Sequence, residues 1–289
     1  MKGYKINDPI SISEFFTVSK QRFDGGYFFG GESHSFYEVV CVLSGRVGIT
    51  AEKNVYVLSQ GQMTIHRPGE FHAIWEEGES APEVIVFTFA ASPFPRIKSN
   101  VYALDENLLA EIKSIYTSCG NVFDIVGERV YYGDSGKSFF ENGLYIESVK
   151  DGMRSEAVRL VKRIEIFLSR ALENAVGNES ASHGEENYAR ILAVMQENLG
   201  RALSVSEIAR LAGMSVPALE KTVFRYMHCG AISYYNILRM ERARAMLISG
   251  NSVKETALVL GYANQNYFSA CFKKRYGYPP SEIKKREIQ

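Results

Sequence analysis

Two segments with the same pattern decide how the C-terminal third of this chain folds: Ser204–Gly213, SVSEIARLAG, and Ser252–Gly261, SVKETALVLG. In each, a Ser is followed three residues later by a Glu, as in a capping box, where the two side chains bond free amides at the start of a helix. The Gly at the end can adopt the left-handed conformation that stops a helix and turns the chain. The pattern therefore predicts two short helices, each followed by a sharp turn.

A second helix is expected after each turn, over residues 215–225 and 264–275. Each begins with a good capping residue, Ser215 or Asn264. Between the two units, residues 233–250 are expected to form one long helix that fixes their separation. A short helix, a turn and a second helix make a helix-turn-helix unit, whose second helix enters the major groove of DNA.

The helix expected over 264–275 has a core face and an outward face. The residues at core spacing are Tyr267, Phe268, Cys271 and Phe272. The outward side chains are Gln265, Asn266, Ser269 and Lys273. Such groups can hydrogen-bond base edges or phosphates. The alternative, a helical bundle with no role on DNA, would also have to explain both capped repeats and the charge of this region.

The formal net charge of zero conceals a strong asymmetry along the chain. From Asn187 onward there are 15 Lys and Arg against 7 Asp and Glu, a balance of +8. Of the 33 residues of each sign, this leaves 18 basic and 26 acidic before that point, a balance of −8. The basic part is suited to a polyanion. The overall composition, 46% hydrophobic and 23% charged, is that of an ordinary globular protein.

These C-terminal residues resemble the AraC/XylS family of transcription regulators. Residues 252–285, SVKETALVLGYANQNYFSACFKKRYGYPPSEIKK, are similar to the C-terminal signature of that family, and residues 238–247, LRMERARAML, to its linker helix. The resemblance covers residues 188–286 and implies a sequence-specific regulator that binds double-stranded DNA and is no enzyme. RNA polymerase would be a further partner if the chain is an activator.

The resemblance also implies which side chains contact DNA. The residues expected at the bases are Glu220, Lys221, Gln265 and Asn266. The expected phosphate anchors are Arg225, Lys273 and Lys274. The chain departs from the family at Ala270, where an Arg is usual, and at His228, where a Gly is usual. A gapless alignment places Val223 at a family Phe, whereas the 48-residue repeat pairs Phe224 with Phe272, so two registers of the first recognition helix stay open.

The N-terminal part carries a different pattern. From residue 36 to about 90, short β-rich runs alternate with Gly-containing turns, which favours an antiparallel barrel or sandwich. These runs resemble the cupin-like barrel that often precedes the AraC-type domain, so the expected fold class is α+β and multidomain, with an all-α double helix-turn-helix domain at the C-terminus. The expected divisions are a barrel over 1–95, a helical segment over 96–176, a linker over 177–187 and the DNA-binding domain over 188–289.

The barrel is expected to bind a small-molecule effector, with a sugar-like ligand favoured by the family resemblance. The expected ligand-binding residues are His34, Tyr37, Glu38, His66 and His72. A metal-binding cupin is the alternative, but such proteins use a His-x-His pair and here the second position is Phe36, so no metal or other cofactor is expected. A cupin enzyme would need a complete metal triad or a nucleophile with its base, and a pure dimerisation module would need a wholly apolar interior. Trp75 is expected to fill the barrel rather than stack on a sugar.

Residues 156–176 are expected to form an amphipathic helix, with Leu160, Ile164 and Phe167 on its apolar face. That face could pack on its own domain or form a homodimer with a second copy. No apolar run is long enough to cross a membrane and no signal peptide is evident, so we expect a cytoplasmic protein. The four cysteines have no metal or redox spacing and are expected to be reduced.

Overall fold

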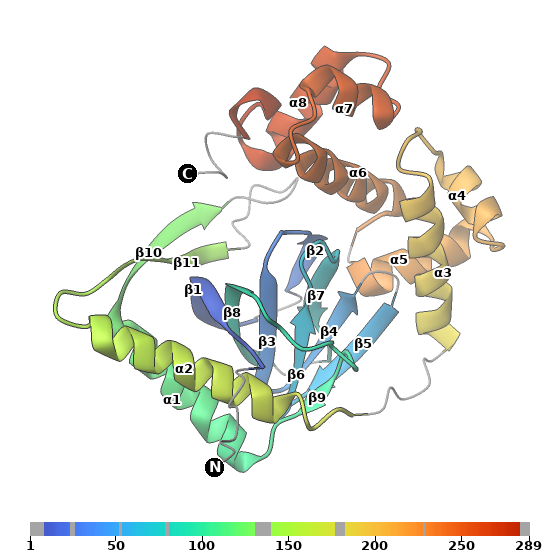
Figure 1. Ribbon diagram of the computed structural model, residues 1–289. Coiled ribbons are helices and arrows are strands. Elements are labelled where there is room, and N and C mark those ends of the chain that lie inside the picture. The colour runs from blue at the N-terminus through green and yellow to red at the C-terminus, as the bar shows by residue number, and fades with distance from the viewer. Residues whose placement is uncertain are drawn as a thin grey trace, which may run out of the picture.

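A computed structural model describes residues 9–23, 27–51, 54–78, 81–130, 140–176, 183–227 and 229–283. The N-terminal domain consists of two antiparallel sheets that face each other, and the C-terminal domain is helical (Figure 1). This arrangement confirms the expected fold class. Among the described helices, none combines the length and apolarity that a bilayer span requires.

The larger sheet has the strand order β10-β11-β1-β8-β3-β6-β9, and the smaller has the order β2-β7-β4-β5. The strands of the larger sheet are β1 (Ile12–Arg22), β3 (Tyr37–Ser44), β6 (Gln62–His66), β8 (Glu83–Ala91), β9 (Tyr102–Ala103), β10 (Phe123–Val130) and β11 (Phe140–Val149). Those of the smaller sheet are β2 (Phe28–Glu32), β4 (Arg46–Ala51), β5 (Asn54–Ser59) and β7 (His72–Glu76).

Aliphatic side chains fill one end of the space between the two sheets. Successive residues of a strand point to opposite faces, so Val40 and Val42 of β3 share the inward face. They meet Val47 and Ile49 of β4 and Leu58 of β5, all of them buried. Each contributes about 1.5 to 3 kcal/mol by burial. The same inward face of β3 carries Glu38 at the other end, so the interior is apolar at one end and polar at the other.

Two helices, α1 (Glu106–Val122) and α2 (Arg154–Ala171), cover the outer face of the larger sheet (Figure 1). The Asp105 side chain begins α1 by accepting a hydrogen bond from the amide of Leu108. The apolar stripe of α2, expected from the sequence, is buried against its own domain. The choice left open by the sequence is thus settled for this face of α2.

The segment expected to be helical, 96–176, also contains strands. Strands β10 and β11 form a hairpin in which β11 pairs with β1, Thr17 opposite Tyr145. Strand β1 lies before the first strand expected from the sequence. Both β1 and this hairpin are positioned by pairing between residues that are far apart in the sequence. A mixture of aromatic and charged residues without a clear period does not reveal such pairing, so the expectation of a helical segment holds for α1 and α2 but not for β10 and β11.

The C-terminal domain contains six α-helices within its described residues and ends in a short 3₁₀ turn, η1 (Pro280–Glu282). The helices are α3 (His183–Glu197), α4 (Val205–Leu211), α5 (Val216–Met227), α6 (Ala231–Ile248), α7 (Val253–Val259) and α8 (Gln265–Tyr276). Helix α3 already begins inside the segment expected as a linker, 177–187, because its apolar side chains from Tyr188 onward need a helix to reach the core. Residues 177–182 lie outside the described ranges.

The two domains share one apolar cluster. Trp75 of β7 points out of the barrel toward the C-terminal helices, and its ring lies 5.9 Å from that of Tyr226 in α5. Gly48 of β4 leaves room for this indole, since a Cβ there would lie 2.0 Å from it. Trp75 therefore does not fill the barrel, and the expectation that it would was wrong. It is also not placed to stack on a ligand inside the barrel.

Candidate DNA-binding helices and a buried histidine cluster

Both helix-turn-helix units are built as the sequence predicts. Ser204 and Ser252 each form a complete capping box with the Glu three residues later. Gly213 and Gly261 have φ values of +66° and +69°, in the left-handed region that glycine adopts without strain. The local signals that predicted these turns are confirmed.

The register of the first recognition helix follows the gapless alignment. Val223 is buried like Phe272, whereas Phe224 is 59% exposed. The first helices of the two units are 48 residues apart, but α5 and α8 begin 49 residues apart, at Val216 and Gln265. The turn of the second unit is therefore one residue longer, and a constant 48-residue offset fails beyond it.

The outward face of α8 carries most of the side chains predicted to contact DNA. Gln265 and Asn266 are exposed at its first turn, Lys273 and Lys274 are exposed near its end, and Ser269 is half-buried between them. A sixth residue of this helix, Tyr267, was expected in the core and is 65% exposed. The core contacts come from Phe268 and Phe272, one turn apart, and Tyr267 lies just outside their stripe.

On α5, Lys221 and Arg225 are exposed and one turn apart, so they point the same way. Glu220, also predicted to contact a base, is used differently. Its carboxylate accepts a hydrogen bond of 3.0 Å from the amide of Ala231, the first residue of α6. A negative charge is stabilised at a helix N-terminus, so Glu220 fixes the junction of α5 and α6.

Helix α6 joins the two units, and buried polar contacts fix the second unit to it. Arg239 donates to the carbonyl of Leu260 and lies over the ring of Tyr262. Glu241 accepts from Arg275 at 3.3 Å and from the Tyr276 hydroxyl at 3.0 Å. Burial raises the pKa of Glu241, and the nearby Arg275 opposes this increase. These contacts set the orientation of α8 relative to α6.

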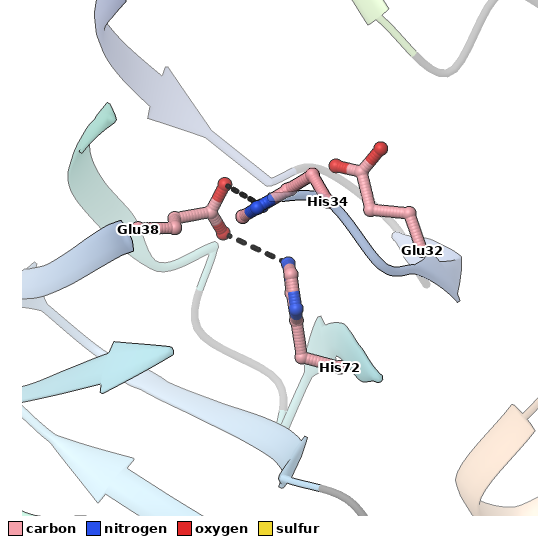
Figure 2. Close-up of side chains that lie close together, drawn as sticks. All are labelled: Glu32, His34, Glu38 and His72. Carbon is pink, nitrogen blue, oxygen red and sulfur yellow. Dashed lines mark ion pairs between the residues drawn. The ribbon is translucent and has the colours of Figure 1, made fainter. Parts of the chain in front are cut away.

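In the N-terminal domain, four side chains converge at the polar end of the interior (Figure 2). Glu32 ends β2, His34 follows it, Glu38 lies in β3 and His72 begins β7. One potential ligand atom from each residue lies within 4.8 Å of the other three. Nε2 of His34 is 3.6 Å from one oxygen of Glu38, and Nε2 of His72 is 3.4 Å from the other.

The imidazole rings of this cluster are held from behind. Nδ1 of His34 lies 3.0 Å from the carbonyl of Phe36, and Nδ1 of His72 lies 3.1 Å from the carbonyl of Glu70. A carbonyl only accepts, so both Nδ1 atoms carry the hydrogen and donate it. The Nε2 atoms point toward Glu38 (Figure 2).

Charge interactions within the cluster outweigh burial. Burial alone would raise the pKa of Glu38, but His72 and His34 together hold it well below its usual value. Burial alone would lower the pKa of His72, but the charge and proximity of Glu38 raise it to about 9. The site thus favours a carboxylate beside positive charge.

The remaining predicted ligand residues lie differently. His66 stacks on His72 at 4.1 Å and pairs through Nδ1 with Glu70, and burial and the charge of His72 lower its pKa to about 4. Tyr37 packs on Phe89 and Phe94, on the opposite face of β3 from Glu38. Four of the five predicted residues therefore lie together, without Tyr37.

Sequence reasoning missed Glu32. A signal was available, because Glu32 and His34 are two residues apart at a strand end, and such residues project to the same side of an extended chain. Its partner is remote in sequence: Glu32 lies opposite His72 across the β2–β7 pair. The spacing alone gave no reason to bring the two together.

Two family models match the chain, the AraC-like ligand binding domain over residues 16–111 and the Helix-turn-helix domain over residues 208–286. The chain thus joins a ligand-binding barrel of this type to a helix-turn-helix domain. It belongs to the AraC family of DNA-binding transcription regulators. This is a family of regulators and not of enzymes, which confirms the expectation from the sequence.

Two relatives of the chain are named as helix-turn-helix transcription regulators, and a solved structure also aligns with it. The chain is 34% identical to the HTH-type transcriptional regulator GbdR of Pseudomonas aeruginosa over 93 residues, which are 32% of this chain and 25% of GbdR. It is 23% identical to the HTH-type transcriptional activator RhaS of Salmonella paratyphi B over 252 residues, 87% and 86% of the two chains. ToxT of Vibrio cholerae O395 aligns in structure with a TM-score of 0.36 and 13% identity, over 96% and 97% of the two chains.

Proposed function

We propose that this chain regulates transcription by binding double-stranded DNA through α5 and α8, under control of a small molecule bound in the N-terminal domain. The observation that carries the proposal is the pair of capped helix-turn-helix units joined by one helix, α6. Each recognition helix has polar and basic side chains on its outward face. No catalytic step is part of this function.

The proposed contacts follow the exposure of the side chains. Base contacts come from Gln265 and Asn266 on α8 and from Lys221 on α5, with Ser269 at the edge of the same face. Phosphate contacts come from Arg225, Lys273 and Lys274. Glu220 is reassigned to the junction with α6, because its carboxylate already accepts from the Ala231 amide.

Salt-dependent DNA binding by the full chain tests this function, with duplexes selected from a random library. Lys273→Ala is expected to reduce the slope of log affinity against log salt by about 1, since one phosphate contact is lost. Gln265→Ala is expected to weaken binding to the selected duplex by about 1 to 3 kcal/mol and to relax its selectivity. The control is Lys113→Ala, which removes an exposed positive charge from α1 in the other domain. If both α8 variants behave like Lys113→Ala, α8 does not read DNA.

The effector is proposed to bind at the polar end of the barrel, next to His34, Glu38, His66 and His72. Aliphatic side chains occupy the other end, and the polar end carries the side chains that can hydrogen-bond a ligand, which supports this proposal. A sugar-like molecule is the proposed class, because hydroxyl groups pair with carboxylates and imidazoles. A panel of sugars titrated into the full chain, with thermal stability as the readout, should give a saturable increase in Tm for at least one member.

Ligand binding can reach the DNA-binding domain through the contact between the domains. Ser33 lies between two residues of the cluster, and its carbonyl is 3.5 Å from the Arg244 guanidinium of α6. We infer a population shift, in which the ligand favours one placement of the C-terminal helices. Equal DNA affinity and equal half-site spacing with and without a saturating effector would contradict this mechanism.

A homodimer is proposed through the outer side of α2 and the β10–β11 hairpin. Val158 and Ile166 of α2 are 60% and 59% exposed and lie two turns apart on one side of the helix. Tyr145 and Val149 of the hairpin are also exposed. Sedimentation of Ile166→Glu should shift toward the monomer, whereas an unchanged dimer would place the interface elsewhere.

We also propose that the protein is located in the cytoplasm. If it is an activator, RNA polymerase is a further partner.

A further inference from the structure

We propose that Glu32, His34, Glu38 and His72 bind one divalent transition-metal ion. Each side chain supplies one ligand, Nε2 of the two histidines and one oxygen of each carboxylate, and these atoms lie within 4.8 Å of one another. The proposal replaces the expectation of no metal. That expectation rested on Phe36 standing at the second position of a His-x-His pair, but the pair is completed in the other direction, by Glu32 two residues before His34.

The two imidazole rings are buried, and their Nε2 atoms make no hydrogen bond within the described part of the chain. The side chains of His34 and His72 are only 6% and 4% exposed. Their Nε2 atoms have no hydrogen-bond partner among the described residues. Buried polar atoms are rarely left in this state. Each Nε2 faces an oxygen of Glu38 at ion-pair distance, and loss of the Nε2 proton from each ring would leave two lone pairs directed at the same carboxylate, an arrangement that a bound cation would bridge.

Both rings carry a hydrogen on Nδ1, which leaves Nε2 as the atom that can bind a metal. Metal-binding histidines usually donate their other N–H to a carbonyl or carboxylate, which fixes the ring and leaves a lone pair for the metal. Here both Nδ1 atoms donate to backbone carbonyls, of Phe36 and Glu70. Phe36 also stacks on the His34 ring at 3.9 Å, which restricts its rotation. Both rings are thus held with Nε2 toward the carboxylates before any ion binds.

The distances between the nitrogen and oxygen atoms also suit a single ion. Two ligand atoms that are each about 2.1 Å from one ion lie about 3.0 to 3.4 Å apart at tetrahedral or octahedral angles. The two Nε2 atoms lie 3.4 and 3.6 Å from the oxygens of Glu38. These two spacings are close to those of ligands on one ion, and the four ligand atoms, which lie within 4.8 Å of one another, would draw together by roughly 1 Å to meet it.

The donor set determines the class of ion. Two imidazole nitrogens with two carboxylate oxygens suit Zn²⁺, Fe²⁺, Mn²⁺, Co²⁺ or Ni²⁺ better than Mg²⁺ or Ca²⁺, which prefer oxygen alone. The two carboxylates balance the charge of a dication. His66 is not included, because its Nδ1 is paired with Glu70 at 2.9 Å. In an octahedral ion, four protein atoms would leave two positions for water or for hydroxyl groups of an effector.

The test is titration of Co²⁺ and then Zn²⁺ into the chelator-treated full chain, followed by visible absorption and calorimetry. The expected result is one ion per chain. Glu38→Gln and Glu32→Gln should each weaken Co²⁺ binding by about a hundredfold or more, since ligand loss should exceed the 10- to 100-fold effect of changing a supporting residue. Glu106→Gln, which changes an exposed carboxylate of α1 in the same domain, should retain the one-to-one stoichiometry and the affinity of the wild type.

Thermal unfolding of each variant without metal checks that it folds. The proposal is overturned if the wild-type chain binds no Co²⁺, or if Glu38→Gln and Glu32→Gln bind it as tightly as the wild type, which would indicate adventitious binding only. Metal binding is measured without DNA, so its failure would leave the proposed regulatory function standing, and a failure of DNA binding would leave the metal site standing.

Discussion

Arg275→Leu is expected to destabilise the C-terminal domain, because it leaves the buried carboxylate of Glu241 without its main positive partner. The two side chains are 11% and 3% exposed, and their atoms are 3.3 Å apart. Removing one member of a buried ion pair costs about 3 to 5 kcal/mol. At the lower figure, a domain of this size should lose about 12 to 24 °C in Tm.

The loss should depend on pH with a definite sign. Burial already raises the pKa of Glu241, and Arg275 opposes this, so the substitution raises the pKa further. An acid whose pKa is higher in the folded state holds more protons there, so stability is greatest below its unfolded value of about 4.3 and falls as pH rises through the folded value. The variant should therefore lose more of its free energy of unfolding at pH 8 than at pH 5.

Urea denaturation of the wild type, Arg275→Leu, Glu241→Gln and the double variant at both pH values measures this effect. Glu241→Gln removes the charge while an amide oxygen can still accept from the Tyr276 hydroxyl, which lies 3.0 Å from the carboxylate. The double variant should recover most of the lost stability. A loss below about 1 kcal/mol for Arg275→Leu, or no recovery in the double variant, would refute the reasoning.

Glycines give two further predictions. Gly48→Ala should disturb the contact between the domains, because the new Cβ would lie 2.0 Å from the Trp75 indole; interdomain cross-linking should fall, and a combined Trp75→Ala change should relieve the clash. Gly261→Ala should cost more stability than Gly213→Ala by urea denaturation. Both have positive φ, worth about 1 to 2 kcal/mol of strain, but only the Cβ at 261 meets backbone, 2.4 Å from the carbonyl of Gly200. Equal losses would show that the neighbouring backbone moves away freely.

The helix-turn-helix units were predictable because their signals are local. A Ser and a Glu three residues apart satisfy each other's amides within a single turn, so Ser204 and Ser252 mark helix starts without any tertiary information. The hairpin β10–β11 has no such signal. It pairs with β1, more than 100 residues earlier, and only the assembled sheet decides that pairing.

Whether the position of a single site residue can be predicted also depends on whether its signal is local or comes from a distant part of the chain. The exposure of Tyr267 depends on which stripe of α8 packs on α6 and α7, which a helical period alone leaves uncertain by one residue. The family resemblance places Glu220 at a base, but its carboxylate accepts from the amide of Ala231, on the next helix. Tyr37 and Glu38 are both expected at the ligand from the sequence, although alternation along a strand sends adjacent residues to opposite faces.

The cluster of Glu32, His34, Glu38 and His72 is connected directly to the DNA-binding helices. Glu32 and His34 flank Ser33, whose carbonyl faces Arg244 of α6, and α6 in turn holds α8 through Glu241. Binding of Glu32 and His34 to one ion would restrict the backbone between them. It would therefore also restrict the Ser33 carbonyl, which accepts from Arg244 of α6. A ligand shifts an equilibrium only by its difference in affinity between two states. The segment 32–34 is where such a difference can arise, because it belongs to the cluster and to the domain contact at the same time.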